Sequence, residues 1–414
     1  MQPTAAQRQP QFPHFSRRRR RLRRWRPSAV HLVLVRLAAV IALGVPGAST
    51  AAREPEAASP AIAGAPDEAA PPGSGIRDYY FYEGRRYGSE SLITPPRLII
   101  NGGFGILQME NRSNRISDID FERGWRGLWN NLGNPVAAID HVGWWDFLHS
   151  ELIPVSINSG KAQYWPNYMN HLIGGGMSYR MMREWFTWHR YPWPTAWALT
   201  TIWSYHLLNE TVEMDGRTGW RADPVADVYI FDIAGILLFS SDRVARFFGQ
   251  TLNMADWSWQ PFYDPELGTL ENAGQNYMVR LRLQNASPWY IFYHWGNSGE
   301  FGLSRHLGDG YHLSAGGGFV AKNLRDVDRF SETANLTTSG GLFLDCEGSL
   351  LASVLYAKNK DNRWRVNLYP GVFRVGPLQP GLAAIVTQQR RVMFGVTIGI
   401  LPLPVGVGAR VGRS

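Results

Sequence analysis

Two periodicities divide the chain. Apolar residues recur every three to four positions over residues 135–250, as in helices that bury one face. From Gly274 onward apolar and polar residues alternate, as in strands with two different faces. The pattern therefore predicts an α+β protein in which a helical module precedes an antiparallel β-module.

Four antiparallel helices are expected in the first module, over residues 135–153, 166–189, 194–214 and 223–248. Asn134 followed by Pro135 is a good N-cap and N1 pair. Asp223 followed by Pro224 is another. The glycines at 174–176 weaken helix propensity and therefore predict a close approach of another backbone.

Strands are expected at residues 97–109, where a glycine kink follows an apolar run, and in about eight segments after Gly274. One face of the first of these eight carries Tyr277, Val279, Leu281 and Leu283, while Arg280 and Arg282 lie on the other. Polar arginines opposite apolar residues, with Tyr and Trp near the strand ends, favour a β-barrel-like module of the outer-membrane type, in which the face with Tyr277 is expected to meet lipid and the arginines a polar lumen. A soluble antiparallel sandwich has the same strand spacing.

The N-terminus has the pattern of a secretory signal peptide. Residues 16–27 are strongly basic, residues 29–45 are apolar, and small residues at 49–51 offer a cleavage point. A retained anchor helix is the alternative. The expected organisation is a signal peptide (1–52), an Ala/Pro-rich linker (53–76), N-terminal strands (77–123), the helical module (124–262) and the strand module (263–414).

Charge and cysteine content exclude several classes of protein. The formal net charge is +8, but 11 arginines lie within residues 1–53, and the remainder has 31 basic and 34 acidic side chains. No basic stripe is left for a nucleic acid, so no nucleic-acid partner is expected. Cys346 is the single cysteine, which excludes an intramolecular disulfide and any multi-cysteine metal site.

Tryptophan is concentrated in the helical module, with 13 of the 17 indoles between Trp125 and Trp259. Indole rings are enriched where one end of the ring is apolar and the other is wet, as at a bilayer interface. The density predicts a helical module that lies at a membrane interface. A soluble core that uses many tryptophans is the alternative.

Three ionisable residues on different predicted helices are the candidate catalytic residues: His171, Glu210 and Asp227. An imidazole and two carboxylates in one pocket of low dielectric would have displaced pKa values, as acid–base catalysis requires. The same set could hold a divalent metal, or could form a hydrogen-bonded network that only fixes packing. Residues expected to support the pocket are Asn167, His206, Asn209, Glu213, Gly174, Gly175 and Gly235.

The residues from 165 to 240 resemble an uncharacterised exported family of Gram-negative bacteria, a domain of unknown function. The resemblance is carried by the Asn167-Tyr-x-x-His171-x-x-Gly174 core, by Asn209-Glu210, and by the helix that begins at Asp223. The order His171, Glu210, Asp227 is distantly similar to the VanZ-like superfamily of membrane proteins, although Phe231 stands where that superfamily often has a polar residue.

The resemblance implies recognition or modification of the head group of an envelope lipid or glycolipid by an outer-membrane-associated protein. His171, Glu210 and Asp227 would be the site residues. A non-catalytic structural or lipid-binding barrel protein is the alternative. The sequence assigns no cofactor.

Overall fold

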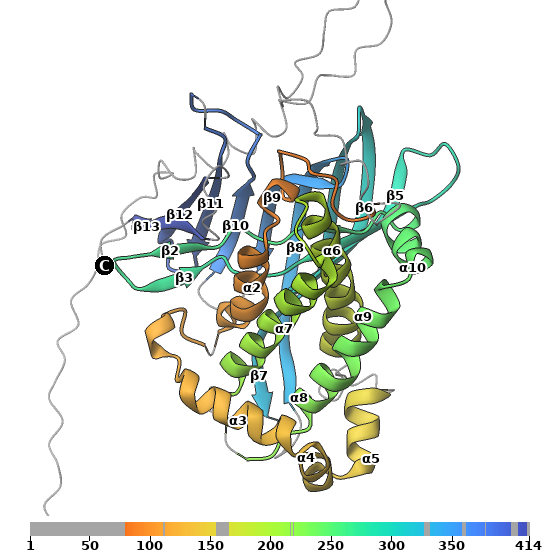
Figure 1. Cartoon of the computed structure of the whole chain (residues 1–414). Helices are drawn as coiled ribbons and strands as arrows, with labels where there is room; N and C mark the ends of the chain where they lie inside the picture. Colours follow the sequence, from red (N-terminus) through yellow and green to blue (C-terminus); the bar gives the residue numbers. More distant parts are fainter. Residues whose placement is uncertain are drawn as a thin grey trace, which may run out of the picture. The chain divides into compact units, whose positions relative to one another are not determined.

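The structure is a computed structural model, shown in Figure 1. It describes residues 79–110, 112–154, 165–215, 217, 219–326, 332–357, 362–376, 378–398 and 405–411. The predicted signal peptide and linker lie outside these residues. Contacts divide the chain into units Met1–Ser59 and Pro60–Ser414, and all described residues belong to the second unit.

The helical part combines α-helices with wider and tighter turns. The α-helices are α2 (Pro95–Phe104), α3 (Phe121–Gly133), α4 (Pro135–Val142), α5 (Trp144–Phe147), α6 (Gly176–Trp188), α7 (Pro194–Glu213), α8 (Asp223–Ala226), α9 (Ile233–Phe239) and α10 (Asp242–Arg246). The π-helical segments are η4 (Leu148–Leu152), η6 (Trp165–Gly175), η7 (Asp227–Asp232) and η8 (Phe247–Thr251). The 3-10 turns are η1 (Glu90–Leu92), η2 (Gly105–Gln108) and η3 (Ile116–Asp118).

The predicted helices are present, but they are less continuous than the sequence suggested. The third is the single helix α7. The first is interrupted at Gly143, whose φ of +101° lies outside the helical region. The fourth is broken after Phe239, and the two arms Asp223–Phe239 and Asp242–Thr251 meet at 81°.

The expected early strands at residues 97–109 are wrong: α2 and η2 occupy this segment. The Thr94 hydroxyl caps α2 by accepting the N–H of Arg97 at 3.4 Å, and Pro95 takes the first helical position. Gly102 and Gly103 lie under the side chains of α7, where a Cβ would lie within 2.5 Å of Tyr205 and Leu208 atoms. The glycines therefore mark a helix contact and not a strand kink.

In the described part of the chain thirteen strands form one sheet, antiparallel except for the pairing of β2 with β13. Their order is β1-β4-β5-β6-β7-β8-β9-β10-β11-β12-β13-β2-β3. The strands are β1 (Ala255–Asp256), β2 (Phe262–Asp264), β3 (Thr269–Glu271), β4 (Tyr277–Arg282), β5 (Trp289–Trp295), β6 (Ser298–Gly308), β7 (Tyr311–Asp326), β8 (Glu332–Cys346), β9 (Ser349–Ala357), β10 (Asn362–Leu368), β11 (Pro380–Thr387), β12 (Val392–Ile398) and β13 (Gly406–Val411).

The sheet is strongly curved. Arg280 on β4 forms a double hydrogen bond with Asp345 on β8, at 2.8 and 2.7 Å, although three strands separate β4 from β8. In a flat sheet four strand spacings would hold these residues about 19 Å apart. The α+β class and the antiparallel sheet are therefore confirmed. Within the described residues the sheet is not closed into a barrel, so the barrel-like prediction holds only in part.

The helices pack on the outer face of the sheet at its first strands. Helix and strand side chains there form one hydrophobic core. Figure 1 shows α2, α6 and α7 in front of the sheet. Tyr277 and Trp295 belong to the same buried cluster as Met177 and Ile202 of these helices. The expectation that Tyr277 faces lipid is therefore wrong, because α6 and α7 cover it. The sheet also begins at β1 (Ala255–Asp256), before the expected boundary at residue 263.

Beyond the helices, the exposed face of the sheet is apolar, and its buried face carries polar residues beside two apolar clusters, one around Phe292 and Phe343 and one around Ile385 and Met393. Buried polar residues include Arg280, His294, Glu300, Ser304, Ser314, Asp345, Arg365 and Asn367. One cross-strand row on the exposed face runs over five neighbouring strands and consists of Leu281, Ile291, Leu303, Ala315 and Leu342. An exposed row of this kind, opposite a buried face with many polar groups, is unusual in soluble proteins.

Among the described helices, no single one has both the length and the hydropathy to cross a membrane. The bent pair described above, Asp223–Phe239 with Asp242–Thr251, meets both criteria only when its two arms are taken together.

Candidate functional site

The candidate site lies where two π-helical segments meet α7. His171 comes from η6, Asp227 and Asp232 come from η7, and His206 and Glu210 come from α7. Close contact of the backbones brings these elements together: a Cβ at Gly235 would lie 2.5 Å from the carbonyl oxygen of Leu172. π-Helical turns are frequent at functional sites.

The His171 ring lies between two carboxylates of η7. Its Nδ1 is 2.9 Å from Oδ1 of Asp232, and its Nε2 is 3.5 Å from Oδ2 of Asp227. One donor atom each from His171, Glu210 and Asp227 falls within a group whose members are all within 4.8 Å of one another. The structure thus brings the three candidate catalytic residues together.

His206 lies on the other side of Asp232. Its Nδ1 is 3.2 Å from Oδ2 of Asp232, and its ring centroid is 5.1 Å from that of His171. Tyr205 packs against the His206 ring with a centroid distance of 3.9 Å. Asp232 therefore lies between the two imidazoles and, through its hydrogen bond, sets the orientation of His171.

Burial dominates the electrostatics of the site. Glu210, Asp227 and Asp232 are 1%, 4% and 2% exposed, and burial together with neighbouring carboxylates raises the pKa of Glu210 and Asp227 well above the ordinary values. Burial lowers the pKa of His171, but the Asp232 carboxylate outweighs it and brings that pKa to about 9. Burial lowers the pKa of His206 well below its usual range, and the charge of His171 adds to this.

More polar residues surround this centre. Asn167 donates to the carbonyl oxygen and to Oε2 of Glu151, at 3.0 and 3.2 Å. Burial, with Glu151 nearby, raises the pKa of Asp223 to about 7. Asn209 donates to Oε2 of Glu213 at 3.5 Å, and Oε1 of Glu213 pairs with Arg217 at 3.3 Å.

The three predicted glycines take different places. Gly235 faces the backbone of η6, as expected for close approach. Gly175 lies beside His206, where a Cβ would be 3.2 Å from Nε2. Gly174 lies against the ring of Tyr277, so it serves the contact between helices and sheet and not the centre itself.

Sequence reasoning missed Asp232 and Glu151. Asp232 is five positions after Asp227, and in an α-helix residues five apart point about 140° away from each other. The π-helical turn of η7 is wider, because its hydrogen bonds join residues i and i+5, and both carboxylates then face His171. Glu151 lies on η4, a π-helical segment, whereas a regular α-helix was expected over residues 135–153.

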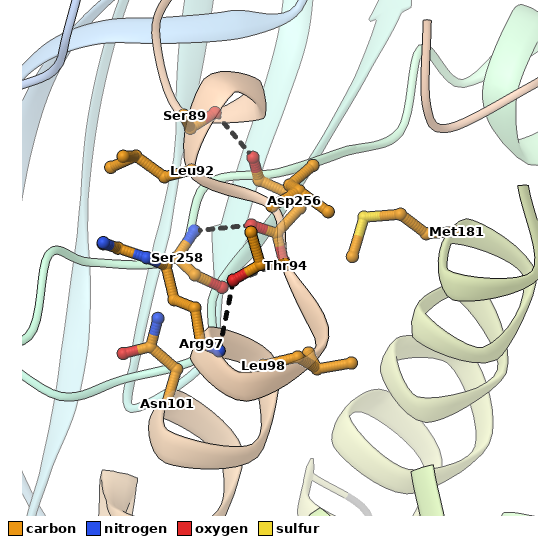
Figure 2. A pocket seen from close by; sticks show the side chains of 10 residues that line it. Ser89, Leu92, Thr94, Arg97, Leu98, Asn101, Met181, Asp256 and Ser258 are labelled. Carbon is orange, nitrogen blue, oxygen red and sulfur yellow. Dashed lines mark hydrogen bonds between the residues drawn. The ribbon is translucent and has the colours of Figure 1, made fainter. Parts of the chain in front are cut away.

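A second polar pocket lies between α2, β1 and α6 (Figure 2). Ser89 donates to the carbonyl oxygen of Asp256 at 2.8 Å, and the Ser258 hydroxyl donates to Oδ2 of Asp256 at 2.9 Å. Arg97 lines the pocket and is 6% exposed, and burial lowers its pKa to about 10. Met181 of α6 stands on the opposite side. The pocket contains none of the residues around His171.

No protein-family model, curated protein or solved structure matches this chain. The site itself therefore carries the functional argument.

Proposed function

We propose that this chain is an exported protein of the cell envelope that modifies the head group of a membrane lipid or glycolipid at the centre of His171, Glu210 and Asp227. The observation that carries the proposal is that these side chains come from three separate helical segments and yet lie together. One potential ligand atom from each lies within 4.8 Å of the others. The distant similarity of the order His171, Glu210, Asp227 to the VanZ-like superfamily suggests the same class of substrate.

The surface supports a position at a membrane. Large apolar side chains are exposed on the helical part, with Trp193, Trp145 and Leu237 at 78%, 71% and 68%. The curved sheet exposes an apolar row and buries polar groups, which is the polarity of outer-membrane barrels. In this proposal the sheet forms a barrel-like wall in the outer membrane, and the aromatic helical part lies at its interface.

The centre has groups for hydrolysis or transfer of a head-group ester. Glu210 or Asp227 accepts the proton of the attacking water or hydroxyl group, which a carboxylate with a raised pKa does near neutral pH, and returns it to the leaving oxygen as the ester bond breaks. His171, held by Asp232, supplies positive charge to the developing negative charge of the transition state. The His171 side chain is 12% exposed, more than Asp227 or His206, so it is where a head group reaches the centre.

A non-catalytic, lipid-binding role is the second candidate. The near-complete burial of Glu210 and His206, 1% and 2% exposed, favours it, because a polar network can fix packing without reacting. The two candidate functions make different predictions for a variant that lacks one carboxylate: only the catalytic function predicts that a lipid modification is lost.

The test is mass spectrometry of envelope lipids from cells that lack the gene and from cells complemented with variants. Glu210→Gln should leave membrane fractionation intact and abolish one lipid modification that the wild type restores. Glu122→Gln is the matched control, because Glu122 is exposed on α3. Identical lipids in all strains would favour the binding role, and recovery of unprocessed protein from the cytosol would contradict export.

A further inference from the structure

Carboxyl groups outnumber cations around His171. The acidic side chains of this centre in the described part of the chain are Glu151, Glu210, Glu213, Asp223, Asp227 and Asp232. Among the described residues His171 and His206 lie within this group, and Arg217 pairs with Glu213. Carboxylates are taken out of water at high cost unless a cation compensates them. Glu210 and Asp227 lie mostly among other carboxyl groups, an arrangement that a bound cation would stabilise.

We infer that a divalent cation of the first transition row, Zn²⁺ or Mn²⁺, binds between Nε2 of His171 and the carboxylates of Glu210 and Asp227. One nitrogen with two carboxylate oxygens is a donor set that suits these ions. Ligands at 2.0–2.2 Å from one ion are at most about 4.4 Å apart. The donor atoms here lie within 4.8 Å of one another, so small side-chain rotations complete the site.

Unsatisfied buried oxygens point to the same position. Among the described residues neither Oε1 nor Oε2 of Glu210 has a hydrogen-bond partner, although the residue is 1% exposed. Oδ1 of Asp227 likewise has none in the part of the chain that is described. Native structures satisfy almost all such atoms, and a bound ion is one way to do so. A network formed only for packing would pair these oxygens with donors.

The orientation of His171 fits a ligand. Nδ1 bonds to Asp232 at 2.9 Å, so the Nδ1–H donates and Nε2 keeps its lone pair toward Asp227. A carboxylate behind the imidazole is the usual outer partner of a metal-bound histidine. The alternative set of His171, His206 and Asp232 also has buried atoms without a hydrogen-bond partner among the described residues, namely both ring nitrogens of His206 and Oδ2 of Asp232. We favour the first set because Asp232 already holds Nδ1 of His171 through Oδ1, whereas no described residue engages either oxygen of Glu210.

Three protein ligands leave room for a water molecule or a head-group oxygen, which is the pattern of catalytic and not of structural sites. With the cation bound, Glu210 and Asp227 would serve as its ligands and not as the base. The cation would replace protonated His171 as the positive charge of the centre and would lower the pKa of the water that it holds. The inference deepens the proposed function but stands on the geometry alone. Its test measures ion binding, so a negative result there leaves the lipid experiment unaffected.

The experiment uses the full chain, stripped with a chelator, and titrates Zn²⁺ and Mn²⁺ separately by calorimetry with the thermal unfolding midpoint as a second readout. Wild type and Glu122→Gln should bind one equivalent of an ion and unfold at higher temperature with it. Glu210→Gln and Asp227→Asn should each weaken binding at least tenfold. Asp232→Asn, outside the ligand set, should weaken it 10- to 100-fold.

Two results would overturn the inference: no uptake of either ion by the wild type, or wild-type affinity in both Glu210→Gln and Asp227→Asn. Circular dichroism without metal checks that the variants are folded. If a ligand variant fails to fold, the ion affinity of Asp232→Asn is the test. An affinity equal to that of the wild type would contradict the site.

Discussion

Glu184 on α6 binds the backbone of the first described residues. Its Oε2 accepts the N–H groups of Tyr80, Phe81 and Tyr82 at 3.1, 2.8 and 3.1 Å. Its Oε1 accepts from Arg180 at 2.8 Å. Burial raises the pKa of Glu184 to about 7, although Arg180 and the backbone N–H groups lower it. The folded protein therefore keeps a proton on this carboxyl at a pH where the unfolded chain has lost it.

This carboxyl should make stability fall as pH rises. Between the ordinary pKa of 4.5 and the folded value of about 7, the folded state binds more protons, so the free energy of unfolding decreases with pH and is level above that range. Glu184→Gln does not titrate. The stability of the wild type relative to Glu184→Gln should therefore fall between pH 5 and pH 8, by roughly 3 kcal/mol at most. Urea unfolding at both pH values measures it, and a pH-independent difference would contradict the shift.

Arg97 is a buried cation with an unsatisfied group. It is 6% exposed, and its Nη1 finds no hydrogen-bond partner among the residues that the structure describes. Arg97→Met removes the cost of burying the charge and keeps most of the packing volume, so stability should rise by about 1 kcal/mol or more. Arg126→Met is the exposed control and should change stability by less than about 0.5 kcal/mol. A large loss for Arg97→Met alone would show that the guanidinium has a partner, such as a bound anion.

At the scale of elements, the sequence predicted where several helices begin, but not the interruptions and π-helical turns inside them. Pro194 correctly marks the start of α7, and Asp223 that of α8. The apolar run before Gly102 has the length of a strand, while the cap at Thr94 indicates the helix that the structure contains. The π-helical turn that aligns Asp227 with Asp232 has no known pattern in a single sequence, because it depends on what packs around the helix.

Gly235 should be intolerant of any side chain. A Cβ there would lie 2.5 Å from the Leu172 carbonyl oxygen, on backbone that has no freedom to rotate away. Gly235→Ala should cost about 1–3 kcal/mol and separate η7 from η6. Gly133→Ala is the matched control in α3, where nothing lies within 4 Å, and it should gain up to about 1 kcal/mol of helix propensity. Thermal unfolding of both variants checks this; equal effects would mean that the contact is loose.

At the scale of the whole molecule, the alternation after residue 274 was enough to predict antiparallel strands, because each strand has two different faces. It did not show which part of the outer face the helices cover. Tyr277 and Leu281 have the same parity on β4, yet Tyr277 is 2% exposed under the helices and Leu281 is 47% exposed. Such coverage depends on contacts between segments about 100 residues apart, such as Ser178 with Tyr277 at 2.9 Å, and no local pattern encodes them.

Substitutions in the exposed apolar row can show whether the sheet faces lipid or water. Leu281 and Leu303, at 47% and 49% exposure, lie on either side of Ile291 in the row. In water, Leu→Arg at an exposed position changes stability by less than about 0.5 kcal/mol. Against lipid near mid-membrane the same change costs about 2–4 kcal/mol, because the guanidinium loses its hydration. Leu281→Arg and Leu303→Arg should therefore destabilise the protein in lipid vesicles by that amount, and Arg282→Gln much less. If both arginine variants unfold like Arg282→Gln, the sheet faces water and the membrane position is wrong.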